Sequence, residues 1–260
     1  MDWTPPLLGF VVGFLVGLTG IGGGSVMTPL LILVGGVRPL VAVGTDLAFA
    51  AITKAVGALV HSRQRTVDRT IVWRLGIGSI PAALAGVTII AWLKGGAENG
   101  TLDRFIMRAL GIALILVAVN VVLRSFQQRD PGETGETTVP EPRGRQQLLT
   151  ILVGAGVGFL VGLTSVGSGS LIAAGLVVLY PRLPLSRIVG TNIFHATFLS
   201  AAAGFAHFSL GSVDLPLLGG LLVGSVPGVW WGSRMAEAVP ERVLRPILAT
   251  ALLGAAYKLL

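Results

Sequence analysis

The chain has 260 residues, of which 53% are hydrophobic and only 12% are charged. A soluble domain carries about 25% charged residues, so too few polar groups are present here to cover a surface exposed to water. No cysteine is present, which excludes disulfides, thiol chemistry and thiolate metal sites. The net charge of +7 lies in short segments between apolar runs, without a basic face of interleaved aromatics, so nucleic acid is excluded as a partner. Composition therefore predicts an all-α polytopic protein embedded in a lipid bilayer.

Eight apolar segments are long enough to form membrane helices, which need about 20 apolar residues each. They are Leu7–Val34, Pro39–Val60, Ile71–Leu93, Phe105–Leu123, Leu148–Tyr180, Pro184–Leu210, Leu215–Ala236 and Val243–Leu260. The first and the fifth are too long for one simple span and are interrupted by glycine clusters. The stretch Arg124–Gln147 has four acidic residues, four arginines and three prolines, which predicts a solvated linker. The N-terminus lacks the basic region and cleavage site of a secretory signal, so the first segment is predicted to be retained.

The sequence contains an internal repeat. Residues 9–25 read GFVVGFLVGLTGIGGGS and residues 154–170 read GAGVGFLVGLTSVGSGS, with seven consecutive identities in GFLVGLT. Collinear matches continue downstream after a one-residue insertion. They pair Val43-Gly44-Thr45 with Val189-Gly190-Thr191, His61 with His207, Val67-Asp68 with Val213-Asp214, and Gly78/Pro81 with Gly224/Pro227. The chain is therefore predicted to hold two homologous four-segment membrane repeats, residues 1–124 and 148–260, joined by a polar linker at 125–147.

Each copy carries a glycine-rich break in its first segment, GIGGGS at residues 20–25 and SVGSGS at residues 165–170. A broken helix leaves backbone groups at membrane depth that hydrocarbon cannot satisfy, and free N–H groups at a helix N-terminus attract anions. The breaks predict a paired backbone cradle for a small anion, and the alternative interpretation is close helix packing or a simple kink. No Gly-Lys-Ser/Thr follows and no strand–turn–helix context exists, so neither a P-loop nor a dinucleotide cofactor site is expected. No cofactor of any kind is expected.

Glycines spaced four residues apart line single helix faces in three of the segments. They are Gly9, Gly13 and Gly17, then Gly154, Gly158 and Gly162, and finally Gly220, Gly224, Gly228 and Gly232. In membranes, such stripes of small residues let helix backbones approach closely. The stripes therefore predict tightly packed helices, which suits a narrow pathway.

Asp46 is the only acidic residue well inside an apolar run, and Lys54 follows eight residues later. Eight residues rise about 12 Å along a helix, so a direct ion pair between the two is not expected. Each is instead expected to meet a broken-helix backbone or the substrate, with Asp46 a candidate for proton coupling. The alternative is a structural buried pair or a lysine that reaches the cytoplasmic surface. The second copy has Asn192 and Ser200 at these positions, so the two copies differ chemically.

The three histidines do not form a metal site, because they are isolated from one another in sequence. His61 and His207 occupy equivalent helix ends, where capping is expected. His195 lies in mid-segment and could relay protons or hydrogen-bond inside the bundle. Asp68 and Asp214 are predicted to be helix N-caps. An intramembrane serine protease would need a nucleophilic serine beside His195, but the serines belong to a duplicated motif, so the chain is not expected to be an enzyme.

Four motifs carry a family resemblance. They are GLTGIGGGS at residues 17–25, MTPL at 27–30, AVGT at 42–45, and Gly57-Ala58 followed by His61. Together they resemble the sulfite exporter TauE/SafE family over essentially the whole chain. The resemblance implies a bacterial or archaeal inner-membrane permease of about eight helices, with sulfite, organosulfonates or other small organic anions as substrates. Family members commonly carry a small hydroxyl residue where this chain has Asp46, and Lys54 is a further departure.

The expected function is secondary transport, as an exporter, of a small anion held between the two breaks. The predicted binding residues are Gly22, Gly23, Gly24, Ser25, Thr45, Gly167, Ser168, Gly169, Ser170, Thr191 and Asn192, and the predicted coupling or charge-carrying residues are Asp46, Lys54 and His195. Backbone N–H groups and hydroxyls would bind the anion's oxygens while one repeat rocks against the other. Protons are the expected coupling ion. An anion channel and a non-transport membrane scaffold are the alternatives.

Basic residues do not settle the membrane orientation. If residues 62–70 are cytoplasmic and eight segments span, nine Lys and Arg fall on each side, with Lys54 left out of the count. The early loops favour cytoplasmic termini. Four spans per copy would make the repeats parallel, whereas a re-entrant break in each copy would make them inverted. The sequence is compatible with a monomer and with a homodimer.

Overall fold

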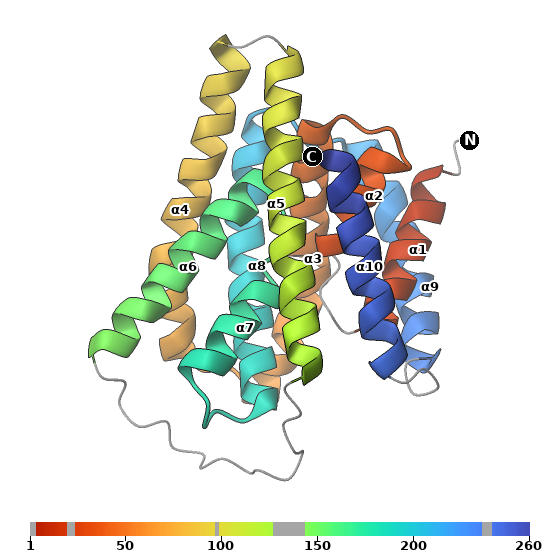
Figure 1. Cartoon of the computed structure of the whole chain (residues 1–260). Helices are drawn as coiled ribbons and strands as arrows, with labels where there is room; N and C mark the ends of the chain where they lie inside the picture. The colour runs from red at the N-terminus through yellow and green to blue at the C-terminus, as the bar shows by residue number, and fades with distance from the viewer. Residues whose placement is uncertain (1–3, 20–23, 97–98, 127–143, 236–240) are drawn as a thin grey trace.

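The computed structural model describes residues 4–19, 24–96, 99–126, 144–235 and 241–260, which form ten α-helices and no strand (Figure 1). The helices are α1 Thr4–Thr19, α2 Gly24–Leu33, α3 Pro39–Arg63, α4 Arg69–Gly96, α5 Asn99–Phe126, α6 Gly144–Thr164, α7 Ser170–Leu179, α8 Leu185–Ser209, α9 Leu215–Met235 and α10 Glu241–Leu259. Six of these, α3, α4, α5, α6, α8 and α9, are long and apolar enough to cross a membrane. The predicted all-α, multi-pass character is confirmed for the described residues.

The outer surface of the bundle is strongly apolar. Trp73, Trp92, Phe205, Val223 and Val226 are each at least 70% exposed. Exposed apolar groups on this scale are unfavourable in water and favourable against lipid tails. The apolar surface and the six long apolar helices therefore both indicate a protein that spans a bilayer several times.

The helices follow the predicted segments but extend beyond several of them. The largest shift is in α5, which begins at Asn99 although the apolar segment begins only at Phe105. Apolar content marks the part of a helix that contacts lipid or core, whereas the backbone hydrogen bonds continue through polar residues. The helix therefore starts earlier than its hydrophobic run.

The predicted break in the fifth segment is present. Helix α6 ends at Thr164 and α7 begins at Ser170, with non-helical backbone between them. Ser165 has φ 64° and Gly167 has φ 103°, two left-handed conformations that stop the helix. The first segment likewise forms two helices, α1 and α2, while the predicted break residues 20–23 lie outside the described residues.

The glycine stripes lie at the two most closely packed helix pairs, α1 with α9 and α4 with α6. A Cβ added to nearly all of these glycines would collide with backbone of the partner helix: Gly9, Gly13 and Gly17 with α9, Gly224, Gly228 and Gly232 with α1, and Gly154, Gly158 and Gly162 with α4. At Gly220 the added Cβ would instead meet the Pro5 side chain of α1. The prediction that these stripes serve close packing is confirmed. Helices α3 and α8, and α5 and α10, form the other extensive contacts.

Corresponding helices in the first and second halves of the chain run in opposite directions. In Figure 1, α1, α3 and α5 run downwards, whereas α6, α8 and α10 run upwards, and both termini lie towards the same end of the bundle. Helices α1 and α2 together return the chain towards the end where it began, as do α6 and α7 at the opposite end. This arrangement excludes the parallel alternative for the two halves.

Two reciprocal hydrogen bonds join the halves. The Asp214 N–H donates to Thr45 Oγ1 at 3.0 Å, and the Asp68 N–H donates to Thr191 Oγ1 at 2.9 Å. Each aspartate also accepts, through Oδ1, a backbone N–H from the first turn of its own helix, α9 or α4, which confirms the predicted N-caps. Each half thus supplies one threonine and one helix start to the other.

The helix-terminal histidines stabilise the corners that follow them. His61 Nδ1 lies 2.9 Å from Thr66 Oγ1, and His207 Nδ1 lies 3.0 Å from Ser212 Oγ. Both hydroxyls donate back to the carbonyl of the same histidine. A structural role at the helix end is therefore confirmed for both residues.

Candidate functional site

Lys54 brings a cationic group from α3 to the break between α6 and α7. Its Nζ donates to Ser168 Oγ at 2.7 Å, across 114 residues of sequence. An ammonium has three donor hydrogens, so this bond leaves donor capacity for a ligand. The contact places a positive charge beside the start of α7.

Helix α7 presents an uncapped N-terminus at this point. Gly169 is its N-cap residue, and no side chain in the described part of the chain caps it. The Leu171 N–H in the first turn donates to the Gly167 carbonyl at 3.0 Å, and first-turn N–H groups that lack such an acceptor carry partial positive charge. Asn192 of α8 donates from Nδ2 to the Gly169 carbonyl at 2.7 Å, which holds the break against α8. An uncapped helix start beside a lysine favours an anion.

Asp46 lies on the same helix as Lys54 and is completely buried. The Thr28 hydroxyl of α2 donates to Asp46 Oδ2 at 2.5 Å. The Ser165 hydroxyl interacts with the same carboxylate, although neither Asp46 Oδ1 nor Ser165 Oγ makes a hydrogen bond of standard geometry within the described residues. Lys54 interacts electrostatically with the Asp46 carboxylate, although the two are not within ion-pair distance.

His195 connects α8 to α4. Its Nε2 lies 2.7 Å from Ser79 Oγ, and its ring is almost completely buried. Lys54 also acts electrostatically on this ring. The Nδ1 atom has no partner in the described residues, so the imidazole keeps one ring nitrogen available for a further hydrogen bond.

These residues share an unusual set of unpaired buried polar atoms. The atoms are Ser170 Oγ, Asn192 Oδ1 and His195 Nδ1, each without a hydrogen-bond partner within the described ranges, and the Ser165 hydroxyl has only the Asp46 carboxylate near it. Leaving one such group unsatisfied costs about 1–3 kcal/mol. Buried polar groups are normally paired, so this set marks a place that takes up water or a polar ligand.

Comparison with known proteins assigns the chain to a family. The family model described as sulfite exporter TauE/SafE matches residues 6–259. This chain belongs to the TauE/SafE family. A probable membrane transporter protein of Bacillus subtilis, YjnA, is 42% identical over 254 residues that cover 98% of each chain.

More distant relatives of this TauE/SafE chain carry similar descriptions. The B. subtilis probable membrane transporter protein YdhB is 27% identical over 244 residues, covering 92% of each chain. A probable membrane transporter protein of Methanocaldococcus jannaschii, MJ0441, is 23% identical over 265 residues, covering 95% of this chain and 90% of its own length. No solved structure matches the chain. The chain is thus a multi-pass membrane protein of a transporter family.

The predicted site residues of this TauE/SafE protein fall into four groups, of which Thr45 and Thr191 are the last. At the break, Lys54 donates to Ser168 and Asn192 donates to the carbonyl of the next residue, Gly169, with Gly167 and Ser170 on either side. Asp46 and His195 form the second group, and each interacts with the charge of Lys54. Ser25 and Gly24 begin α2, where Ser25 is buried, while Gly22 and Gly23 lie outside the described residues.

Thr45 and Thr191 have a contact that the sequence did not predict. Both are completely buried, and each hydroxyl accepts the backbone N–H of the opposite half described above. A hydroxyl keeps its own hydrogen after accepting one bond. Their visible role is structural, since each joins the two halves of the chain. Their expected role in binding substrate stays a prediction.

Two polar residues of the site, Thr28 and Ser79, were missed by sequence reasoning, and Ser165 was expected only as part of the glycine-rich break. Each contacts or lies beside a predicted residue: Thr28 and Ser165 at Asp46, and Ser79 at His195. All three are buried. A usable signal existed for Thr28 and Ser79, since each is a hydroxyl within an otherwise apolar run.

Proposed function

We propose that this TauE/SafE protein is a secondary transporter that exports a small anion, with sulfite, organosulfonates and related organic anions as its substrate class. The observation that carries the proposal is the Lys54 ammonium on Ser168, beside the uncapped start of α7. A half-buried cation, helix N–H groups and free hydroxyls are the donors that an oxyanion requires. The inner membrane of a bacterium or archaeon is the proposed location.

The proposed mechanism is alternating access between two inverted repeats. The sequence repeat, the opposite directions of corresponding helices and the reciprocal threonine contacts support it. Inverted repeats commonly place the substrate site where broken helices of the two copies meet. Rocking one repeat against the other would expose that site to each side in turn. Substrate, lipid and a coupling proton are the partners this scheme needs.

A thermal-shift panel tests the substrate class. Sulfite, a sulfonate such as taurine or isethionate, and a carboxylate are added to purified protein at equal ionic strength. An anion that binds the native state at 100 times its Kd is expected to stabilise it by about 2.7 kcal/mol, seen as a raised Tm. Sulfate, as a matched doubly charged oxyanion, controls for general salt effects. No ligand-specific shift in any member of the panel would contradict the proposed substrate class.

Flux in proteoliposomes separates transport from the two alternatives. A carrier gives flux that saturates with substrate concentration and shows counterflow of labelled substrate. A channel gives flux without counterflow, and a scaffold gives no flux above that of empty liposomes. Saturation with counterflow is the expected result.

The Asp46→Asn variant tests proton coupling. An ionised Asp46 offsets the Lys54 charge that would bind the anion, so protonation of the carboxyl is expected to favour binding and deprotonation to oppose it. Transport by the unmodified protein should therefore fall as pH rises. Asp46→Asn should lose this pH dependence and keep the low-pH behaviour. Asp103→Asn, a carboxylate outside the site that faces Arg38 at 3.8 Å, is the control and should keep the original profile. An unchanged profile in Asp46→Asn would remove Asp46 from the coupling mechanism.

A further inference from the structure

The two ends of the bundle differ in basic charge. At the lower end in Figure 1, α3, α5, α7 and α9 finish and α4, α6, α8 and α10 begin. Basic residues with described side chains at these helix ends and their connections are Arg63, Arg65, Arg69, Arg74, Arg145, Arg182, Arg187 and Arg234. We call this surface the basic end. The Gln146 side chain, at the start of α6, donates to the Leu179 carbonyl at the end of α7, which confirms that these helix ends meet.

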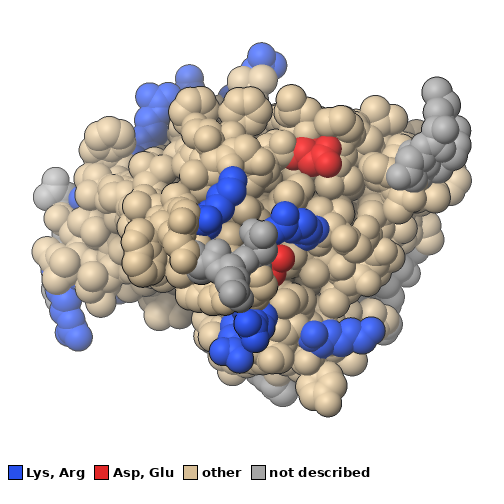
Figure 2. Space-filling view, turned by 90° about the horizontal axis from the view of Figure 1, so that it is seen from above, with Lys and Arg blue, Asp and Glu red and all other residues tan. Residues whose placement is uncertain are grey.

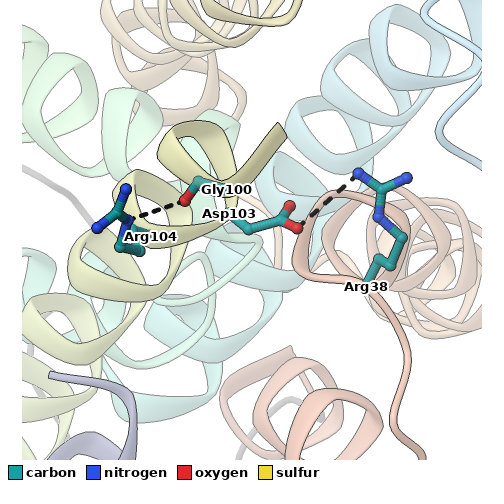
Figure 3. A network of polar contacts seen from close by, with 4 residues as sticks. All are labelled: Arg38, Gly100, Asp103 and Arg104. Carbon is teal, nitrogen blue, oxygen red and sulfur yellow. Dashed lines mark hydrogen bonds and ion pairs between the residues drawn. The ribbon is translucent and has the colours of Figure 1, made fainter. Parts of the chain in front are cut away.

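The opposite end carries fewer basic residues, and most of them have partners. Figure 2 looks onto this end, where scattered Lys and Arg side chains lie among uncharged residues and acidic side chains also reach the surface. Figure 3 shows Arg38 facing Asp103 at 3.8 Å, and Arg104 donating to the Gly100 carbonyl at 3.0 Å. Lys94 donates to the Leu210 carbonyl at 2.6 Å. Arg108 and Lys258 complete the basic residues of this end in the described ranges.

Exposed tryptophans mark both edges of the membrane. Trp73 and Trp92 of α4 are 74% and 77% exposed. They are 19 positions apart, which corresponds to about 28 Å along a helix and matches the roughly 30 Å hydrocarbon core. Trp230, near the end of α9, lies under the Arg234 guanidinium at 3.6 Å and is half-exposed at the basic end. Tryptophans of this kind sit at membrane interfaces, so the basic end begins where the hydrocarbon stops.

We propose that the basic end lies on the anionic lipid headgroups of the cytoplasmic leaflet, so that both chain termini face the other side of the membrane. Lys and Arg near membrane helices are retained on the cytoplasmic side, and each is attracted to the anionic surface of that leaflet. Among the described residues, the basic end has eight arginines and the opposite end has five basic residues. This difference favours the orientation in which the basic end is cytoplasmic. This orientation does not depend on which anion is carried.

The proposal reverses the expectation of cytoplasmic termini. That expectation counted the first and fifth segments as crossings, which divided the basic residues equally. Because α1–α2 and α6–α7 each return towards the end where they began, Arg182, Arg187 and Arg234 join Arg63 at one end and Lys258 moves to the other. The basic residues are then no longer divided equally between the two ends, and most of them lie at the basic end.

Single-cysteine labelling tests the orientation, and the chain has no cysteine of its own to remove. Gly100 and Gly144 form a matched pair, because each is exposed in the first turn of a helix and a Cβ there meets nothing within 4 Å among the described residues. In intact cells, a membrane-impermeant maleimide is expected to label Gly100→Cys and to leave Gly144→Cys unlabelled until the cells are permeabilised. The opposite pattern, or equal labelling of both before permeabilisation, overturns the proposal.

A reporter at the C-terminus gives an independent reading if either cysteine variant is poorly produced. Alkaline phosphatase fused after Leu260 is expected to be active, and green fluorescent protein at the same place to be dark. An inactive phosphatase fusion together with a fluorescent green fluorescent protein fusion would place the C-terminus in the cytoplasm and overturn the orientation.

The role of charge is tested separately. The triple variant Arg63→Gln, Arg65→Gln, Arg69→Gln weakens the basic end, and it should raise the fraction of Gly144→Cys that is labelled in intact cells. An unchanged fraction would show that these arginines do not set the orientation.

Discussion

The variant Lys54→Ser is expected to bind the transported anion roughly 10- to 100-fold more weakly and to lose saturable flux at substrate concentrations that suffice for the unmodified protein. Hydrogen bonds to charged groups contribute about 1.5–3 kcal/mol, and the donor on Ser168 would be gone. Serine is the residue found at the equivalent position of the second copy, Ser200, so the substitution makes the two copies alike at this point. Isothermal calorimetry for binding and proteoliposome flux for transport measure the effect.

Lys94→Ser is the matched control for this experiment. Lys94 also donates one hydrogen bond, to the Leu210 carbonyl, but it lies at an exposed helix end away from the break. Its loss should leave anion binding within about twofold of the original. If Lys54→Ser binds and transports as well as Lys94→Ser, the anion site does not include Lys54 and the proposed function loses its main support.

The variant Gly158→Ala is expected to destabilise the folded protein strongly. A Cβ at Gly158 of α6 would lie 2.5 Å from the Ser79 Cα and 2.7 Å from its carbonyl carbon, and backbone cannot yield as a flexible side chain would. Overpacking of this kind costs about 1–3 kcal/mol. The α4–α6 pair would separate, and Ser79 would move from its contact with His195. A lower Tm in detergent, together with reduced recovery of monodisperse protein, is the expected measurement.

Gly156→Ala, two residues earlier on the same helix, provides the control. A Cβ there meets nothing within 4 Å in the described structure, and alanine favours helix by about 1 kcal/mol over glycine. The Tm should therefore stay the same or rise slightly. Equal losses in both variants would show that the close contact at Gly158 is not what holds α6 to α4.

Much of the architecture could be predicted because it depends on local sequence. Apolar length locates the membrane helices, and the clustered glycines and serines at 165–170 locate the end of α6 and the start of α7. The four-residue glycine spacing predicts a face of close contact. It does not identify the partner, since any helix with small residues would fit, and the structure shows that α1 packs on α9 while α6 packs on α4.

The site was predictable in kind but not in its pairings. A lysine inside an apolar segment was expected to meet a broken helix. Helical periodicity gives only a direction around the axis, so Ser168 could not be singled out as its partner. Thr28 was missed for a different reason. Attention to matched positions favours duplicated residues, and Thr28 stands opposite Ala173 in the second copy. Residues that make the copies differ are the ones a repeat comparison passes over.

The exchange of packing partners between the halves has a consequence for biosynthesis. Helix α1 ends at Thr19, but the helix that covers its glycine face, α9, begins at Leu215. At 5–20 residues per second, a ribosome needs roughly 10 to 40 s to make the intervening chain. Throughout that interval the glycine face of α1 lies in the bilayer without the helix that packs on it in the folded protein. The nascent first half therefore depends on lipids or on the insertion machinery to shield that face, and a stalled or truncated chain would leave it open to unrelated helices with small residues.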